Sequence, residues 1–197
     1  LNEATEMVLK TMKQFGMGFE DTTDIVDKFM GVITKSFMRA DRLREALKYT
    51  GQTAGALGMP FEEVLAALSM LVDVGYEGGQ AGQRLNMILT KLLKPSSEAR
   101  EALASLGLTV SDISPKTHSL VEILYKLRAA GFGAAEASTM FRARTAAASI
   151  TLVEHVDDIA RMAEHLKVVG GLTEKLAKKQ METFWGALKK LGAAVQD

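Results

Sequence analysis

The feature that most constrains the fold is a pair of apolar stripes at helical spacing between residues 51 and 93, separated by a glycine-rich break. Residues three and four apart lie on one side of a helix, so each stripe predicts one buried helical face. Pro60 is expected as the first residue of the first helix, where Glu62 and Glu63 complement the positive end of the dipole. Gly75 and Pro95 are expected to end the two helices. The stripes consist of Phe61, Val64, Leu65, Leu68, Leu71 and Val72, followed by Leu85, Ile88, Leu89 and Leu92.

The composition is that of an ordinary globular protein with balanced charge. The 197 residues include 24 Lys and Arg and 24 Asp and Glu, which gives no electrostatic reason to bind nucleic acid or an anionic membrane. The absence of cysteine excludes disulfides and thiolate chemistry. We expect no signal peptide and no transmembrane segment, because the chain lacks an apolar run of about eighteen residues. Because it begins with leucine, we expect it to be a piece of a longer protein.

The rest of the chain repeats the pattern of short helices. Helices are predicted over 2–15, after Thr22 or Thr23 as a cap, from Asp41 with alanine and glycine on the buried side, and over 97–106. Others are predicted over 120–131, 132–150, 150–166 and 172–195, whereas 108–117 is predicted to be non-helical. The expected anchors of the last helix are Leu176, Met181 or Phe184, Trp185, Leu188 and Leu191.

These elements predict an all-α fold, either a bundle or an elongated array of about 8–10 short antiparallel helices without a significant β-sheet. Three regions are expected along the chain: an N-terminal helix over 1–18, a helical core over 19–131, and alanine-rich helices over 132–197 that form a possible extended arm. The eleven methionines are spread along the sequence, which favours packing within the core over a binding surface.

The titratable side chains show no spacing that indicates a metal or catalytic site. The three histidines lack the four-residue spacing of a helical zinc pair, and we expect them to be surface or satisfied polar groups. An Asp triplet recurs at three-residue steps near a helix start, but its third member lies inside the helix, so a solvated face is favoured over a calcium site. These residues are His118, His155 and His165, and Asp21, Asp24 and Asp27.

A cluster of glycines and a pair of arginines each have a structural and a binding interpretation. The cluster of Gly75, Gly78, Gly79 and Gly82 lacks the lysine and hydroxyl residue of a phosphate-binding loop, so a tight interhelical turn is favoured over an anion site at a helix beginning near residue 81. Arg142 and Arg144 are interpreted as a solvated face rather than a partner contact. No serine lies in a recognisable nucleophile motif. We therefore expect neither an enzyme nor a cofactor.

The central stretch resembles the core region of phage tail tape-measure proteins. The resemblance covers residues 15–112 best, with helical segments at 43–51 and 94–112 that fit the family, and weaker similarity to about residue 151. Gln83 and Asn86 depart from the family, which usually has Thr and Arg there. The matching residues, expected to be structural, are Ala54, Gly58, Glu62, Glu63, Ala66, Ala67, Leu68, Leu71, Gly75, Gly78, Ala81, Gly82 and Leu85.

The resemblance implies a structural component of a phage or prophage tail. Such a protein sets tail length during assembly, takes part in DNA delivery, and lies in the tail-tube lumen after assembly in the host cytoplasm. It implies the tail tube protein and tail assembly chaperones as partners, with possible self-association, and neither a small-molecule substrate nor sequence-specific nucleic-acid binding. The alternatives are a generic helical scaffold or protein-interaction module, or a membrane-associated helper domain of DNA passage.

Tail length would be set by an extended helical rod that lengthens by about 1.5 Å per residue. Glycine and proline cut the helices of this chain to about 10–20 residues, so we do not expect it to be the ruler itself. We expect instead an elongated helical hairpin arrangement or a marginally stable bundle whose alanine- and glycine-rich helices separate first.

Overall fold

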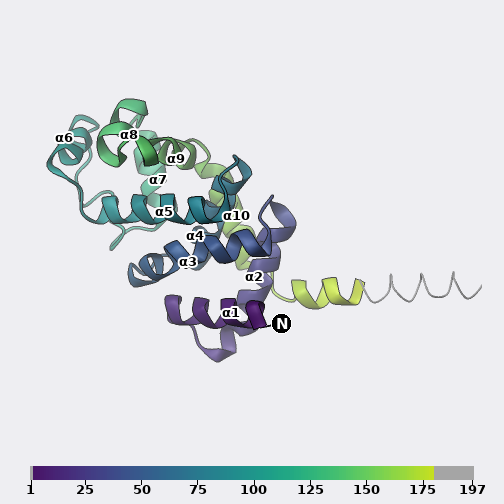
Figure 1. Ribbon diagram of the computed structural model, residues 1–197. Helices are drawn as coiled ribbons and strands as arrows, with labels where there is room; N and C mark the ends of the chain where they lie inside the picture. The colour runs from purple at the N-terminus through teal and green to yellow at the C-terminus, as the bar shows by residue number, and fades with distance from the viewer. Residues whose placement is uncertain (1, 180–197) are drawn as a thin grey trace, which may run out of the picture.

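The computed structural model describes residues 2–179 as a stack of short helices (Figure 1). The all-α prediction is confirmed, because no residue between 2 and 179 lies in a strand. In chain order the elements are α1 (Asn2–Phe15), the 3-10 helix η1 (Phe19–Asp21), α2 (Thr22–Lys35), α3 (Ala40–Ala56), α4 (Phe61–Asp73), α5 (Gly78–Leu93), α6 (Ser97–Ser105), α7 (Leu120–Ala129), α8 (Ala134–Phe141), α9 (Ala143–Glu154) and α10 (Val156–Lys167). A further helical segment covers 172–179.

Most predicted helices form, with local differences at their ends. Helix α1 has the predicted bounds, and the stretch 108–117 is non-helical as expected. Helix α2 is capped by Asp21, so neither Thr22 nor Thr23 is the cap. Pro60 is the N-cap of α4 rather than its first residue, because its ψ of 127° is extended. Of the helix predicted over 172–195, the part beyond 179 lies outside the described residues, as do Met181, Phe184, Trp185, Leu188 and Leu191.

Two of the predicted helices are interrupted. The segment 132–150 divides into α8 and α9 at Arg142, whose φ of 62° and ψ of 164° are incompatible with either helix. The helix predicted over 150–166 is broken at His155, which ends α9 and caps α10. Each break turns the chain, so α8, α9 and α10 pack on different sets of neighbours.

Helices α1, α3 and α5 lie one above another and run in the same direction (Figure 1). The direction follows from the contacts, because Glu3 pairs with Arg44 while Gln14 lies against Gly51 and Gly55 further along both helices. These neighbours are therefore parallel rather than antiparallel as expected. The reason is that α2 and α4 each return the chain between two members of the stack.

Helix α4 is the centre of the core. Ten of its thirteen residues are buried, including Ala66 and Ala67 outside the predicted stripe. A helix that is apolar on all sides must be surrounded, and α4 contacts α2, α3, α5, α7, α9 and α10. Full burial of a large apolar side chain contributes about 1.5–3 kcal/mol. The α4 side chains Val64, Leu65, Leu68 and Leu71 are each fully buried, which makes this helix the main source of stability.

Candidate functional site

The closest helix contact joins α5 to α3 through two glycines. A Cβ atom on Gly82 would lie 2.2 Å from the carbonyl oxygen of Ala46, and one on Gly78 would lie 2.1 Å from that of Arg42. Only glycine permits this approach of two backbones. The predicted interhelical turn is therefore correct for Gly75, which has a φ of 107°, but wrong for Gly78, Gly79 and Gly82, which belong to α5.

The same device joins α1 to α3. A Cβ on Gly55 would lie 1.7 Å from the backbone carbonyl oxygen of Gln14, and one on Gly51 would meet the Gln14 side chain. Glycine on α3 thus lets α1 pack closely, and glycine on α5 lets α5 pack closely on the opposite part of α3. The alanine and glycine residues predicted on the buried side of α3 thus lie where neighbouring helices approach closely.

The thirteen family-motif residues all lie in or between α3, α4 and α5. Gly58 and Gly75 have positive φ and close the C-terminal ends of α3 and α4. At each end an amide one residue later, of Met59 or Tyr76, reaches back to a helix carbonyl and completes the cap. The fully buried members are Ala54, Ala66, Ala67, Leu68, Leu71, Ala81 and Leu85.

The two glutamates of the motif connect α4 to its neighbours. Glu62 forms an ion pair of 2.7 Å with Lys28 on α2, which also pairs with Asp24. Burial is the largest single influence on both groups and opposes their charges, but the hydrogen bonds and opposite charges around them outweigh it together. The pKa of Glu62 is therefore lowered, mainly by Lys28, and that of Lys28 is raised by Asp24 and Glu62. The buried Glu63 accepts a hydrogen bond of 2.9 Å from the backbone amide of Val121, at the N-terminus of α7.

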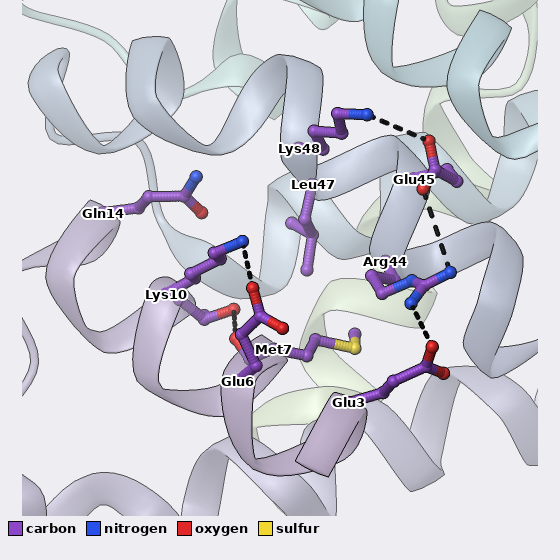
Figure 2. Close-up of a pocket in the computed structure, with 10 residues that line it drawn as sticks. Glu3, Glu6, Met7, Lys10, Gln14, Arg44, Glu45, Leu47 and Lys48 are labelled. Carbon is purple, nitrogen blue, oxygen red and sulfur yellow. Dashed lines mark hydrogen bonds and ion pairs between the residues drawn. The ribbon is translucent and has the colours of Figure 1, made fainter.

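A groove of about 400 Å³ runs between α1 and α3 (Figure 2). Met7 and Leu47 supply apolar surface, while the charged side chains pair across or along the groove: Lys10 with Glu6, Arg44 with Glu3 and Glu45, and Lys48 with Glu45. Three acids face three bases, so the groove carries no net charge. It therefore offers little to attract a charged ligand.

A second groove of about 400 Å³ lies between α4 and α10. Asp73, at its edge, accepts a hydrogen bond of 2.7 Å from the Phe37 amide, and burial raises the pKa of its carboxyl group despite that bond. His165 also lines this groove, and its Nε2 atom is buried without a hydrogen-bond partner. Asp158 pairs with Arg161 in the same wall, so its charge is already neutralised.

The residues weighed as metal ligands do not converge. His118 lies against Lys126 and His155 against Asp158, whereas His165 lines the α4–α10 groove. Within residues 2–179 no cluster of three or more His, Asp or Glu side chains has an arrangement that could hold a metal ion. The three Asp side chains also have separate partners. Asp21 accepts a hydrogen bond from the Gly18 amide and Asp24 pairs with Lys28, whereas Asp27 is buried and accepts hydrogen bonds from two distant backbone amides. The expectation of a solvated acidic face is thus wrong for Asp27.

The remaining candidates lie on the surface or in ordinary helical positions. Arg142 and Arg144 are exposed, as the solvated-face interpretation requires. Ser69 and Ser149 are buried, and each donates a hydrogen bond to a helix carbonyl three residues earlier. Met12, Met38, Met59 and Met140 are buried in the core, although Met87 is exposed and Met181 lies outside the described residues. Within the described part, no helix is both long and apolar enough to cross a membrane.

Sequence reasoning missed three residues with clear structural roles. Lys28 is buried between two acids, Asp27 is buried opposite residues far along the chain, and Gly31 lies under the end of α10. One signal was available: Lys28 and Gly31 interrupt the polar and apolar pattern of α2. Apart from Asp24, however, the partners of these residues are 34 to 146 residues away and leave no local trace.

The chain is similar to phage tail proteins over most of its length. A family model described as phage-related minor tail protein matches residues 1–149. A tape measure protein of Pneumococcus phage Dp-1 is 20% identical over 98% of this chain, which spans 17% of that protein. A probable tape measure protein of Escherichia phage P2 is 23% identical over 100% of this chain, which spans 25% of that protein. No solved structure matches the chain.

Proposed function

Because this chain belongs to the phage-related minor tail protein family, we propose that it is the folded region of a phage or prophage tape-measure protein. In this role it is a structural part of the tail, and the protein that contains it sets tail length during assembly and takes part in DNA delivery. The carrying observation is that two proteins named as tape measure proteins align with nearly all of the chain. The family match favours this function over a generic helical scaffold.

The described helices support a folded body rather than a ruler. The longest of them, α3, has 17 residues and therefore spans about 26 Å. The chain reverses after almost every helix, and the helices share one core around α4. A body of this kind adds little length per residue. The continuous helical length that measures the tail would therefore come from other parts of the much longer relatives.

We place this body in the tail-tube lumen, with the tail tube protein and tail assembly chaperones as partners. The family match and the two aligned tape measure proteins support a place in the tail. The region acts by packing and contact rather than by catalysis. As part of this proposal, the chain divides into an N-terminal region over 1–18, a helical core over 19–131 and an alanine-rich region over 132–197.

The test is tail assembly in the phage or prophage that encodes the chain. Gly82→Leu is incompatible with the α3–α5 contact, whereas Gly79→Ala on the same helix meets only ordinary contact distances. We expect Gly82→Leu to yield few or no tailed particles by electron microscopy, and Gly79→Ala to yield tails of normal length. Mass spectrometry of purified tails should detect peptides of this chain. Normal tails lacking those peptides would contradict the proposal.

A deletion distinguishes the body from the ruler. Removing residues 134–167 would shorten an extended helical rod by about 50 Å at about 1.5 Å per residue. We expect this deletion to abolish assembly instead, because it removes α8, α9 and α10 from the core. Tails shortened by that amount would mean that this region measures length directly.

A further inference from the structure

Asp27 holds two backbone amides from the other end of the described chain. It lies in the middle of α2 and is 1% exposed. Its Oδ2 atom accepts a hydrogen bond of 2.6 Å from the Gly171 amide, and its Oδ1 atom accepts one of 2.8 Å from the Thr173 amide. Both carboxylate oxygens are therefore engaged by the start of the helical segment 172–179. Hydrogen bonds to an ionised carboxylate are about twice as strong as neutral ones.

Gly31, one turn further along the same face of α2, holds the end of α10. A Cβ there would lie 2.8 Å from Leu166 Cδ2 and 3.2 Å from Val169 Cγ1, so the absence of a side chain leaves room for both. Leu166 and Val169 are themselves buried. One face of α2 thus makes an apolar contact at Gly31 and two hydrogen bonds at Asp27. Both involve the short stretch 166–173.

The helical segment that follows leaves the body. Gly171 has a φ of 75°, which turns the chain sharply between α10 and this segment. The yellow-green helix then extends away from the other helices (Figure 1). Residues 172 and 173 are half-buried, but 174, 175 and 177–179 are exposed. The body therefore contacts this helix mainly at its first turn, where the positive end of its dipole faces the Asp27 carboxylate.

We propose that Asp27 is a positioning residue that latches the 170–173 turn onto α2 and thereby fixes the direction in which the helix 172–179 leaves the body. With the two hydrogen bonds intact, the helix has one orientation. When they are broken, the turn around Gly171 is free to rotate while the α4-centred core stays folded. This inference does not depend on a role in a phage tail, because it concerns only contacts within the chain.

The test measures the orientation of the helix 172–179 in the 197-residue chain. The chain has no cysteine, so spin labels can be attached through Lys35→Cys on α2 and Ala177→Cys on the helix 172–179. Both sites are exposed. We expect pulsed electron resonance to give one narrow distance distribution. Adding Asp27→Asn should broaden it, because one acceptor oxygen of the carboxylate is replaced by an NH2 group that faces a backbone N–H donor. Glu20→Gln, which neutralises an exposed acid beside α2, is the matched control and should leave the distribution narrow.

A second measurement remains informative if Asp27→Asn perturbs the fold. By nuclear magnetic resonance of the unsubstituted chain, the Gly171 and Thr173 amides should exchange with solvent at least about tenfold more slowly than the exposed amide of Gly170. A narrow, unchanged distance distribution in a folded Asp27→Asn chain would overturn the proposal. So would unprotected Gly171 and Thr173 amides in the unsubstituted chain.

Discussion

Gly82 of α5 lies directly against Ala46 of α3, where even a methyl group would approach the Ala46 carbonyl oxygen to 2.2 Å. The obstacle is backbone on a packed helix, which cannot rotate aside as a flexible side chain would. Gly79, three residues earlier on α5, is different: a Cβ there would meet only the edge of the Tyr49 ring at 3.4 Å. Helix α5 can therefore accommodate a methyl group at Gly79 but not at Gly82.

The first prediction uses this difference. Gly82→Ala should lower the free energy of unfolding by about 2–3 kcal/mol, because α5 must move away from α3 and loses packing along its length. Gly79→Ala should raise it by about 0.5–1 kcal/mol through better helix propensity. Urea denaturation followed by circular dichroism measures both. Equal effects of the two substitutions would show that α3 and α5 are not in close contact.

The glycine cluster also shows what the sequence could and could not predict. Gly75 follows an apolar stripe, which is a local signal, and its role as a helix end was predictable. Gly78 and Gly82 are four residues apart and face α3, but local sequence does not say which helix will lie opposite. Glycine is common in turns and uncommon inside helices, so the turn was favoured. The spacing of four was the one available signal of helix packing.

The second prediction concerns the stability that Glu62 contributes and its loss at low pH. The pKa of Glu62 is lowered in the folded state: burial opposes the shift, but the hydrogen bond and charge of Lys28, together with a backbone hydrogen bond, outweigh it. The unfolded chain therefore binds protons more readily, so this contribution to stability is complete above pH 4.5 and is lost as the pH falls through the lowered pKa. Glu62→Gln should cost about 1–3 kcal/mol at pH 7 and much less at pH 3.

The control for that prediction is Glu20→Gln, which changes the same charge on an exposed acid. It should alter the free energy of unfolding by less than about 0.5 kcal/mol at either pH. Urea titrations at pH 7 and pH 3 give the comparison. A Glu62→Gln cost that stays constant with pH would mean that its pair with Lys28 contributes no net stability.

The third prediction concerns Asp73, whose contribution to stability changes with pH in the opposite direction to that of Glu62. Burial raises the pKa of Asp73, so the folded state binds a proton there more tightly than the unfolded chain. Its stabilising contribution is present at low pH and is lost as the pH rises through the raised pKa. At pH 7 the carboxylate also lies at the negative end of the α4 dipole. Asp73→Asn keeps an acceptor for the Phe37 amide and should raise the free energy of unfolding by about 0.3–1 kcal/mol at pH 7. A loss of stability on chemical denaturation would contradict this.

The residues that sequence analysis misjudged share one physical reason. Asp27 was expected to be solvated because its charge fits a surface, but its partners are the amides of Gly171 and Thr173, 144 and 146 residues away. The breaks at Arg142 and His155 were not expected because neither residue ends helices by itself. The packing of α8, α9 and α10 on the core imposes those breaks. Local periodicity predicted which residues form helices, and long-range contacts decided where the helices turn.

The fourth prediction follows from the Arg142 backbone. Its φ of 62° with ψ of 164° is a region that glycine occupies almost alone, and holding another residue there costs about 1–3 kcal/mol. Arg142 is exposed, so removing its side chain loses little packing. Arg142→Gly should therefore raise the free energy of unfolding by about 1 kcal/mol. Arg144→Gly makes the same chemical change inside α9 and should lower it by about 0.5–1 kcal/mol. Thermal melts of both variants are the measurement, and a destabilised Arg142→Gly chain would show that no strain is stored there.

The fifth prediction concerns the order in which the helices separate, which matters for any protein that must pass along a narrow tube. Helix α4 has ten buried residues, whereas the buried residues among 3–15 of α1 are Thr11 and Met12. Local opening is easiest where least apolar surface is buried, so amides of α1 should exchange with deuterium before those of α4, with the α3–α5 pair in between. This order differs from the sequence-based expectation that the alanine- and glycine-rich helices separate first, because α3 and α5 pack closely on each other. Hydrogen-exchange mass spectrometry at pH 7 resolves the order. A marginal bundle also implies a melting temperature below about 90 °C. Uniform exchange of α1 and α4 at one rate, or melting above that temperature, would mean that the helices separate only by complete unfolding and that a body of this kind could not open in steps.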